Sequence, residues 1–357
     1  HIQEPKTQIE FLHQAFENHF QAVKYSERRM RQIISEIKPD IIIQNDCYAI
    51  PALALANVPL VVMFSINPLH ILHDNLPPAT FGLPLNDTKD WDKCRKLWET
   101  ERLKKLWKRY NQWLESMGAP SLKKYYFTYT STHLNALIYP LALAKDYLKL
   151  CPVDDTWMCL DHALRTSKGC FEIPEKVKRR NAKMVYFSVG TISSMVIELM
   201  QRLISILAKS KHSFIVSTGK FHDAIELAEN MWGDNDLPQL SILPQVDLVI
   251  CHGGSNTFIE TLYFGKPLIL LPVFVDQHDN AQRAAEMNIA IKLNPFTVEE
   301  RELLSTIDNL LENKEITNNV AIISKQIRET DSMDKFIDRL ESVASDAKKP
   351  NVVSPKK

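Results

Sequence analysis

The stretch VDLVICHGGSNTFIETLYFGKPLILLPVFVDQHDNAQRAAEMN, residues 246–288, decides the fold of this chain. It alternates short apolar runs rich in β-branched residues (VDLVIC, PLILLPV) with amphipathic segments that have helical spacing (SNTFIETLYFG, DNAQRAAEMN). Parallel neighbouring strands need long crossover connections, which are usually helices. The alternation therefore predicts a parallel sheet covered by helices on both faces.

The same alternation extends in both directions from this stretch. Upstream, KMVYFSVG and HSFIVSTG read as strands, SSMVIELMQRLISILAKS reads as the helix between them, and a helix is predicted near 220–232. Downstream, IAIKL reads as one more strand. These segments form one doubly wound α/β unit.

A second unit is predicted in the first half of the chain. Its expected elements are a helix over 21–37, the strand DIIIQND, the helix AIPALALAN, and the strands VPLVVMFS and HLNALIYP. Residues 141–182 read as irregular and polar, which places the domain boundary there. We expect an N-terminal domain over 1–165, a C-terminal domain over 166–325, and a helix and tail over 326–357 that pack back on the N-terminal domain.

Aromatic residues recur at helical spacing in WDKCRKLWETERLKKLWKRYNQWLESMG, residues 91–118. Leu103, Leu106, Tyr110 and Trp113 are three or four residues apart along this segment, and Trp98 lies five residues before Leu103. Two readings are open: an amphipathic helix that packs on its own domain, or a wall of a ligand site.

The composition favours a small-molecule partner. Across 357 residues, Lys+Arg 43 balances Asp+Glu 43, so the formal net charge of +0 argues against a nucleic-acid or anionic-membrane binder. The six cysteines form no C-x-x-C pair, which argues against a zinc ribbon or redox motif. The sequence shows neither a signal peptide nor an apolar run of about 18 residues. We expect a soluble, cytoplasmic monomer that needs no metal and no cofactor.

Glycine is scarce, and its distribution points to a site. Only nine glycines occur, and six of them fall within residues 190–265. Ligands of open α/β sheets bind beyond the carboxyl ends of the strands. Four predicted strand ends in the C-terminal unit are polar or glycine-rich: SVGT (188–191), STG (217–219), CHGGSNT (251–257) and VDQHDN (275–280).

The CHGGSNT segment is the most informative of the four. His252 ends a strand, Gly253 and Gly254 permit close backbone approach, and the next three residues open a helix whose free N–H groups favour an anion. A phosphate group fits this description, although a capped turn around a buried histidine would explain it equally well. The segment contains neither G-x-G-x-x-G nor a P-loop.

Two further positions favour the phosphate reading. Glu260 lies one helical turn beyond Asn256, where its carboxylate can accept hydrogen bonds from the two hydroxyls of a ribose. Asp276 and Gln277 stand at the next strand end and suit the hydroxyls of a second sugar. An anion site, a ribose site and a hexose site together describe a nucleotide sugar.

The fifty residues PQLSILPQVDLVICHGGSNTFIETLYFGKPLILLPVFVDQHDNAQRAAEM resemble the donor-binding signature of the family 1 UDP-sugar glycosyltransferases. His252 precedes Glu260 by eight positions and Gln277 by twenty-five, as in that signature. The resemblance implies the GT-B fold of two Rossmann-like, doubly wound α/β domains that face each other. Weaker similarity extends through SVGT and IIIQNDCY.

The resemblance also implies roles for individual donor-site residues. His252, Asn256 and Thr257 would hold the diphosphate with help from Thr191, and the backbone would approach it closely at Gly190 and Gly254. Gln239 would contact uracil, Glu260 would bind the ribose, and Asp276 and Gln277 would bind the transferred sugar. Ser255 replaces a tryptophan of the plant signature HCGWNS, and Gln277 favours glucose over galactose.

Family members transfer the sugar with inversion, by direct displacement. A histidine accepts the acceptor's proton, and an aspartate orients that histidine. Asp46, at the end of the strand DIIIQND, matches the aspartate, although a helix cap would explain it too. The histidine has no match, because His13 and His19 lie in amphipathic helical sequence. We therefore expect the family's first strand, with its histidine-bearing loop, to be missing from the N-terminal domain upstream of His1.

The N-terminal domain should line the acceptor site, with Tyr48, Phe64, Asn67 and His70 as candidates. An apolar and aromatic lining suits a lipophilic acceptor of phenolic, flavonoid or xenobiotic type, as in detoxification or the conjugation of secondary metabolites. Two alternatives stay open: a nucleotide-sugar binding protein without catalytic activity, and another GT-B enzyme such as a UDP-sugar epimerase.

Overall fold

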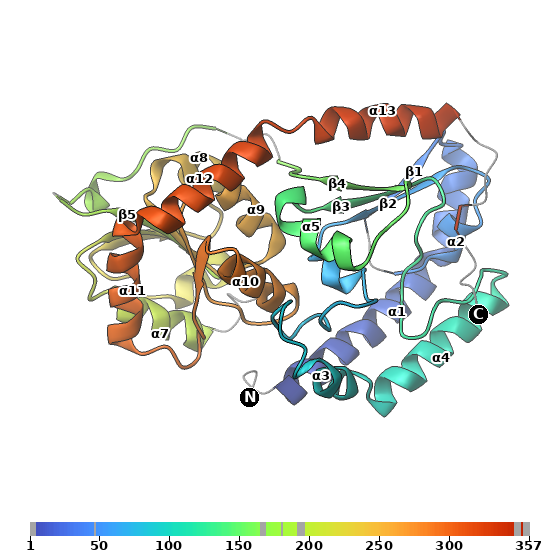
Figure 1. Ribbon diagram of the computed structural model, residues 1–357, viewed down its shortest axis with the longest axis horizontal. Coiled ribbons are helices and arrows are strands. Elements are labelled where there is room, and N and C mark those ends of the chain that lie inside the picture. The colour runs from blue at the N-terminus through green and yellow to red at the C-terminus, as the bar shows by residue number, and fades with distance from the viewer. Residues whose placement is uncertain are drawn as a thin grey trace. The chain divides into compact units, whose positions relative to one another are not determined.

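A computed structural model of the chain (Figure 1) describes residues 5–45, 48–164, 169–179, 181–190, 197–345 and 351–352. The chain divides into two compact units. Unit 1 comprises residues 1–78, 87–161 and 331–357, and unit 2 comprises residues 79–86 and 162–330. The C-terminal segment thus belongs to the same unit as the N-terminal half, and one short N-terminal segment belongs to unit 2.

Unit 1 contains a parallel sheet of four strands in the order β1-β2-β3-β4. The strands are β1 (Ile42–Gln44), β2 (Leu60–Phe64), β3 (Leu134–Ile138) and β4 (Trp157–Leu160). β3 is buried along its whole length, as the apolar run predicted. β4 and the helix before it, α5 (Leu141–Leu150), correct the expectation of irregular structure over 141–182: exposed lysines on α5 and the short, half-buried β4 made this region look like a linker.

The remaining helices of unit 1 are α1 (Pro5–Ile37), α2 (Pro51–Ala54), η1 (Pro68–His70), α3 (Trp91–Trp98), α4 (Glu101–Ser116) and α13 (Ser332–Ser345). α1 is longer than the predicted helix over 21–37, and it ends where Lys38 adopts a left-handed conformation just before Pro39. α4 starts at Thr100, whose hydroxyl accepts a hydrogen bond from the Leu103 amide at 3.2 Å.

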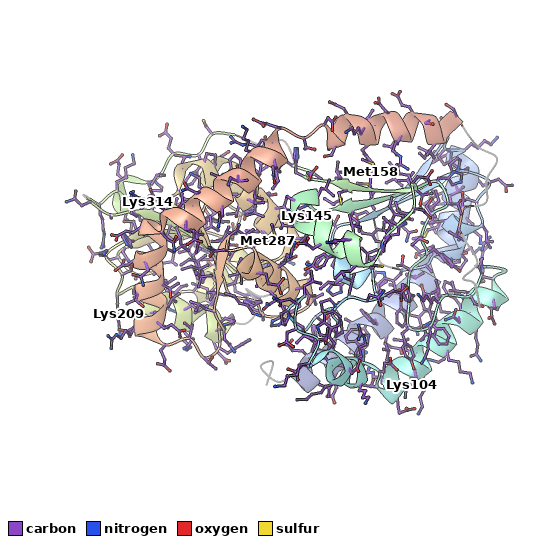
Figure 2. All side chains as sticks on the ribbon, in the orientation of Figure 1. Lys104, Lys145, Met158, Lys209, Met287 and Lys314 are labelled. Atoms are coloured by element: carbon purple, nitrogen blue, oxygen red, sulfur yellow. The ribbon has the colours of Figure 1, made fainter. Side chains whose placement is uncertain are left out.

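α4 is the aromatic helix of the sequence, and its apolar face packs on its own unit. Tyr110 is fully buried, donates a hydrogen bond to the Ala49 carbonyl at 2.6 Å and packs on Phe20 with ring centroids 4.7 Å apart. Charged residues such as Lys104 lie on the outer face (Figure 2), where Lys104 pairs with Glu101 at 2.7 Å. The structure therefore favours the packing interpretation for this helix.

Unit 2 contains a parallel sheet of six strands in the order β10-β9-β8-β5-β6-β7. The strands are β5 (Met184–Ser188), β6 (Ser213–Ser217), β7 (Met231–Asp234), β8 (Leu248–Cys251), β9 (Leu268–Leu270) and β10 (Ala290–Lys292). The chain first places β6 and then β7 on one side of β5, and it then crosses to the other side of β5 with β8. The order reverses between β5 and β8, which is where open α/β sheets bind ligands.

The helices of unit 2 are α7 (Ile197–Leu207), η3 (Gly219–Ala224), α8 (Gln239–Ile242), η4 (Leu243–Gln245), α9 (Ser255–Tyr263), α10 (Asp276–Glu286), α11 (Glu300–Glu312) and α12 (Lys314–Arg328). The helix predicted near 220–232 was wrong. Only the short 3-10 helix η3 forms there, and Met231 instead pairs with Phe214 at the start of β7. The buried Asn230 side chain fixes this path by donating to the carbonyls of Leu207 and His212, each at 3.1 Å.

No helix of the described residues is long and apolar enough to cross a membrane.

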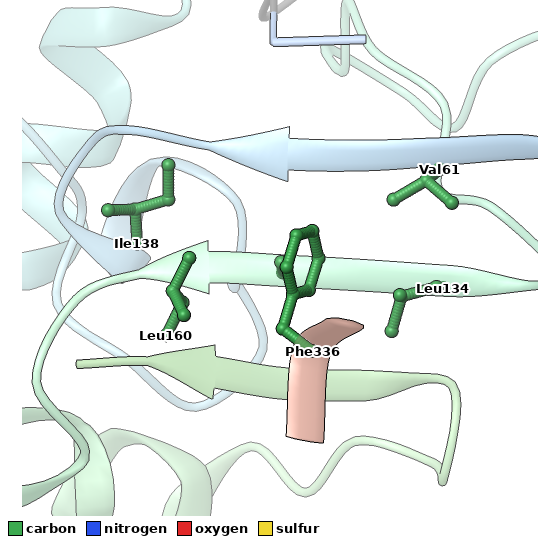
Figure 3. Packing of buried hydrophobic residues seen from close by; sticks show 6 residues of the cluster. Val61, Leu134, Ile138, Leu160 and Phe336 are labelled. Carbon is green, nitrogen blue, oxygen red and sulfur yellow. The ribbon is translucent and has the colours of Figure 1, made fainter. Parts of the chain in front are cut away.

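The helix α13 covers the sheet of unit 1 (Figure 3). Its Phe336 is 6% exposed and packs into a cluster formed by Val61 of β2, Leu134, Ala136 and Ile138 of β3, and Leu160 of β4. Strands from the first half of the chain thus share a core with a helix near its end. Met158 is partly buried at the edge of this cluster (Figure 2).

We expect Phe336→Ala to lower the free energy of unfolding by about 3–5 kcal/mol, because it leaves a cavity among fully packed side chains. Ile337→Ala on the same helix is the matched control, since Ile337 is 46% exposed and should change stability by only about 0.5 kcal/mol. Urea unfolding of both variants measures the difference. Equal effects would mean that α13 does not contribute to the core of unit 1.

Candidate functional site

The predicted phosphate loop and the SVGT segment are neighbours at the centre of the unit 2 sheet. β5 and β8 pair in parallel, with Ser188 opposite Cys251. The two segments that follow, Val189–Gly190 and His252–Gly254, therefore leave the sheet side by side at its carboxyl edge. This is the expected position for a ligand in an open α/β fold.

The imidazole of His252 is packed between two glycines. A Cβ atom on Gly190 would lie 2.4 Å from Nε2 and Cε1 of His252, and one on Gly254 would lie 2.3 Å from Nε2. No side chain fits at either position while the imidazole stays in place. Gly190 also has a φ of +73°, which favours glycine independently.

His252 is held in its neutral form. Burial lowers its pKa to about 4, and the backbone of Ser188 opposes this shift weakly. Its Nδ1 atom is buried and makes no hydrogen bond to any described residue. An uncharged imidazole with an unused polar atom can serve as a hydrogen-bond partner near pH 7 but carries no positive charge there.

Helix α9 starts immediately after this histidine. Its N-terminal cap is Gly254, which has no side chain with which to cap the first N–H groups of the helix. Asn256 is exposed on the first turn, whereas Thr257 and Glu260 are buried, 8% and 5% exposed. An anion at this helix start would meet the positive end of the helix dipole.

Three of the predicted donor residues meet in a buried polar network. The Gln239 amide donates to the Thr257 hydroxyl at 3.3 Å and also to the Glu260 carboxylate. Tyr186 completes the network by donating its hydroxyl to Oε1 of Gln239 at 3.0 Å. The structure thus brings Gln239 into direct contact with residues 18 and 21 positions away.

Sequence reasoning missed Tyr186. Burial raises its pKa to about 12, so the hydroxyl stays protonated and acts as a donor. The signal was present in KMVYFSVG, where Tyr186 shares the strand face of Ser188 at a spacing of two. Its role depends on its partner Gln239, which is 53 residues away in the sequence.

The Asp276–Gln277 pair forms the first two residues of α10 (Figure 1). Oδ2 of Asp276 accepts a hydrogen bond from the Ser255 hydroxyl at 2.7 Å, so the helix start of α9 and that of α10 are linked. The buried Asn280, which the sequence did not single out, donates to the Gly253 carbonyl at 2.9 Å and reinforces the link.

The loop before α10 is unusually constrained. Oε1 of Gln277 accepts the amides of Val273 at 2.9 Å and Phe274 at 3.2 Å. Val275 has a φ of +56°, a conformation that a β-branched residue rarely adopts. Such strained positions persist only where the surroundings fix them, and they are common at ligand sites.

The structure describes only some of the remaining predicted residues. Asp46 and Thr191, from the predicted catalytic and donor sets, lie outside the described residues. Phe64 and Asn67 are fully buried: Phe64 stacks on Trp157 with centroids 5.7 Å apart, and Asn67 donates to the Tyr139 hydroxyl at 3.2 Å. Both serve the packing of unit 1 in this conformation and expose no surface to an acceptor.

The other two acceptor candidates differ from each other. Tyr48 is 8% exposed and stacks on His19 with ring centroids 3.9 Å apart. His70 is half-buried at the end of η1, so part of its side chain can meet solvent or a ligand. No group of three or more His, Cys, Asp or Glu side chains in the described part of the chain could hold a metal ion.

Comparison with known proteins finds relatives of part of the chain. Residues 172–339 match the family described as UDP-glucoronosyl and UDP-glucosyl transferase. An uncharacterized UDP-glucosyltransferase of Bacillus subtilis, YdhE, is 27% identical over 182 residues, which cover 50% of this chain and 45% of that protein. Human UDP-glucuronosyltransferase 2B15 is 32% identical over 91 residues, covering 25% of this chain and 17% of the relative.

Solved structures resemble the chain over most of its length. The glycosyltransferase of kitacinnamycin has a TM-score of 0.68 at 18% identity and covers 96% of this chain and 84% of its own. The spinosyn rhamnosyltransferase SpnG, complexed with thymidine diphosphate, has a TM-score of 0.66 at 16% identity, with 93% and 81% covered. The predicted GT-B fold is thereby confirmed.

The chain spans about half or less of the length of these curated relatives. The residues that match the family, 172–339, include the strand, loop and helix around His252. The similarity to the UDP-glucoronosyl and UDP-glucosyl transferase family thus lies in residues 172–339, which contain the whole sheet of unit 2.

Proposed function

We propose that the protein transfers a hexose, preferably glucose, from a UDP-sugar to a hydroxyl group of a small lipophilic acceptor. The observation that carries the proposal is that two features lie next to each other in unit 2, where the order of the strands reverses. His252 is packed between two glycines at the start of α9, and the network of Gln239, Thr257 and Glu260 lies beside it. A diphosphate and a nucleoside need these two features next to each other.

In this proposal the donor is bound from the phosphates outward. The first N–H groups of α9, together with His252 and Thr257, bind the diphosphate. Glu260 binds the ribose hydroxyls, and Gln239 contacts the uracil. Before the donor binds, these side chains form hydrogen bonds with one another, and bonds to the nucleotide then replace them. The polar groups are thus already in place, with little polar surface exposed.

The transfer itself is a direct displacement. The acceptor oxygen forms a bond to C1 of the sugar, the bond between C1 and the phosphate oxygen breaks, and UDP leaves with the electron pair. A base takes the acceptor proton, and Asp46 orients that base. The helix dipole of α9 and the N–H groups stabilise the charge that develops on the leaving phosphate. The reaction as written needs no metal or cofactor.

A second candidate is a protein that binds nucleotide sugars without turning them over. It is favoured by one observation: the histidines of α1 are engaged in packing. His13, 1% exposed, contacts Trp98 and shares a hydrogen bond with Thr100, and His19 stacks on Tyr48. Neither is free to act as the base.

Incubation of the full-length protein with UDP-glucose and a mixture of flavonoids separates the two candidates. Glycosylated product detected by mass spectrometry is the expected result, and Asp46→Asn should lower kcat by about 10²–10⁴-fold, the range of general acid–base contributions, with UDP affinity unchanged. UDP binding without product would favour the binding protein. An unchanged kcat in Asp46→Asn would reduce Asp46 to a structural role, and absence of UDP binding would contradict the proposal.

Glu260→Ala should weaken UDP binding by about 1–3 kcal/mol, because the ribose hydroxyls lose a buried, charged acceptor. Inorganic pyrophosphate, which has no ribose, should bind with unchanged affinity. Glu229→Ala is the matched control, since Glu229 has a 97% exposed side chain in the same unit. Calorimetric titration measures all three, and UDP affinity equal to that of the wild type would remove Glu260 from the donor site.

The neutral state of His252 predicts a pH dependence of stability. Its folded pKa of about 4 lies below the usual 6.5, so between these values the unfolded state binds a proton that the folded state does not. The contribution of His252 to the free energy of unfolding is therefore complete above pH 6.5. It decreases as the pH falls toward 4, by at most about 1.4 kcal/mol for each pH unit.

The stability difference between wild type and His252→Asn should therefore shrink as the pH is lowered from 7 to 4.5. Urea unfolding at several pH values measures it. Between pH 7.5 and 9 the difference should be constant, which serves as the control. A constant difference down to pH 4.5 would mean that His252 ionises alike in both states.

A further inference from the structure

Residues 79–86 (ATFGLPLN) belong to unit 2, although the residues on both sides of them belong to unit 1. Three backbone amides attach this segment, which we call the strap, to helix α10. Thr80 and Gly82 donate to the two carboxylate oxygens of Asp279 at 2.7 and 3.0 Å, and Leu85 donates to Glu286 at 2.9 Å. The helix is thus bound from its first turn to its last residue, next to Met287 (Figure 2).

Asp279, which accepts two of these hydrogen bonds, is a buried residue. Its side chain is 1% exposed, and a buried carboxylate is tolerated only when it is hydrogen-bonded or paired. Lys292 supplies a compensating charge. Burial lowers the pKa of Lys292, and the charges of Asp279 and Glu286 act in the opposite direction. The Lys292 ammonium also donates to the Gly82 carbonyl at 3.4 Å.

The strap must bend sharply to present two amides to one carboxylate. Thr80 has a φ of +82° and Gly82 a φ of +56°, both in the left-handed region. A Cβ atom on Gly82 would lie 2.6 Å from the carbonyl oxygen of His278. The strap backbone is therefore in direct contact with the residue that follows Gln277.

The contact falls on the turn that begins with Asp276 and Gln277, which we call the sugar pair. The backbone before this turn is constrained as well, by the left-handed Val275 and by the two amides that Gln277 accepts. The first turn of α10 is thus fixed by its own loop on one side and by the strap on the other. A shift of His278 would move both members of the sugar pair.

We propose that the strap is a positioning element for the transferred sugar, with Gly82 and Asp279 as positioning residues that act through the sugar pair. The inference rests on the proposed function, because it assigns the sugar of the donor to Asp276 and Gln277. It adds that a segment of the N-terminal half of the chain sets the geometry of the sugar subsite. The diphosphate and nucleoside subsites at β5, β8 and α9 do not touch the strap in the described hydrogen bonds, so they keep their geometry without it.

The test compares UDP with UDP-glucose in calorimetric titrations of the full chain. Gly82→Ala forces the strap away from His278, and Asp279→Asn removes one of the two acceptors without changing the side-chain size. In both variants the affinity for UDP-glucose should fall about tenfold relative to the affinity for UDP, the equivalent of one or two lost hydrogen bonds. Gly169→Ala is the matched control: Gly169 has a φ of +95° in the same unit, and none of the described residues lies within 4 Å of its added Cβ.

The outcomes separate a positioning role from a structural one. A selective loss of UDP-glucose affinity in both variants, with Gly169→Ala like the wild type, supports the proposal. Equal loss of UDP and UDP-glucose affinity, including complete loss through unfolding, would overturn it, because the strap would then support the unit as a whole. Unchanged affinities would overturn it too. Wild-type protein that binds neither ligand would instead overturn the proposed function.

Discussion

The packing of the His252 imidazole between the backbones of Gly190 and Gly254 is the constraint on which the rest of the site depends. It holds the end of β5 against the end of β8 at the reversal of strand order. It also leaves the histidine neutral and the start of α9 open. Because the contact requires two glycines, it explains why a chain with only nine glycines places two of them here.

Two chains of hydrogen bonds extend from this contact. Along α9, Thr257 and Glu260 join Gln239 and Tyr186 in a buried network. Across the sheet edge, Ser255 and Asn280 tie the histidine loop to Asp276 on α10. Internal hydrogen bonds thus fix the relative positions of the residues in the proposed donor site, an arrangement that would lower the entropic cost of binding a long, polar ligand.

The sequence predicted those parts of the structure that depend on local pattern. Strands such as β8 and loops such as His252–Gly254 follow from apolar runs and from the spacing of polar residues around them. It failed where long-range partners decide. A helix is predicted near 220–232, but Met231 pairs with Phe214 of β6 instead. Tyr186, Asn280 and the strap at Thr80–Gly82 acquire their roles only through residues that are distant in the sequence.

The most direct test of the account is a calorimetric titration of UDP into wild-type protein and Gly254→Ala. The backbone of Gly254, with φ −63° and ψ 140°, is one that alanine adopts without strain, so only the added Cβ, 2.3 Å from Nε2 of His252, disturbs the site. The account predicts that wild-type protein binds UDP and that the variant stays folded but loses this binding. UDP affinity that is the same in both proteins would contradict it.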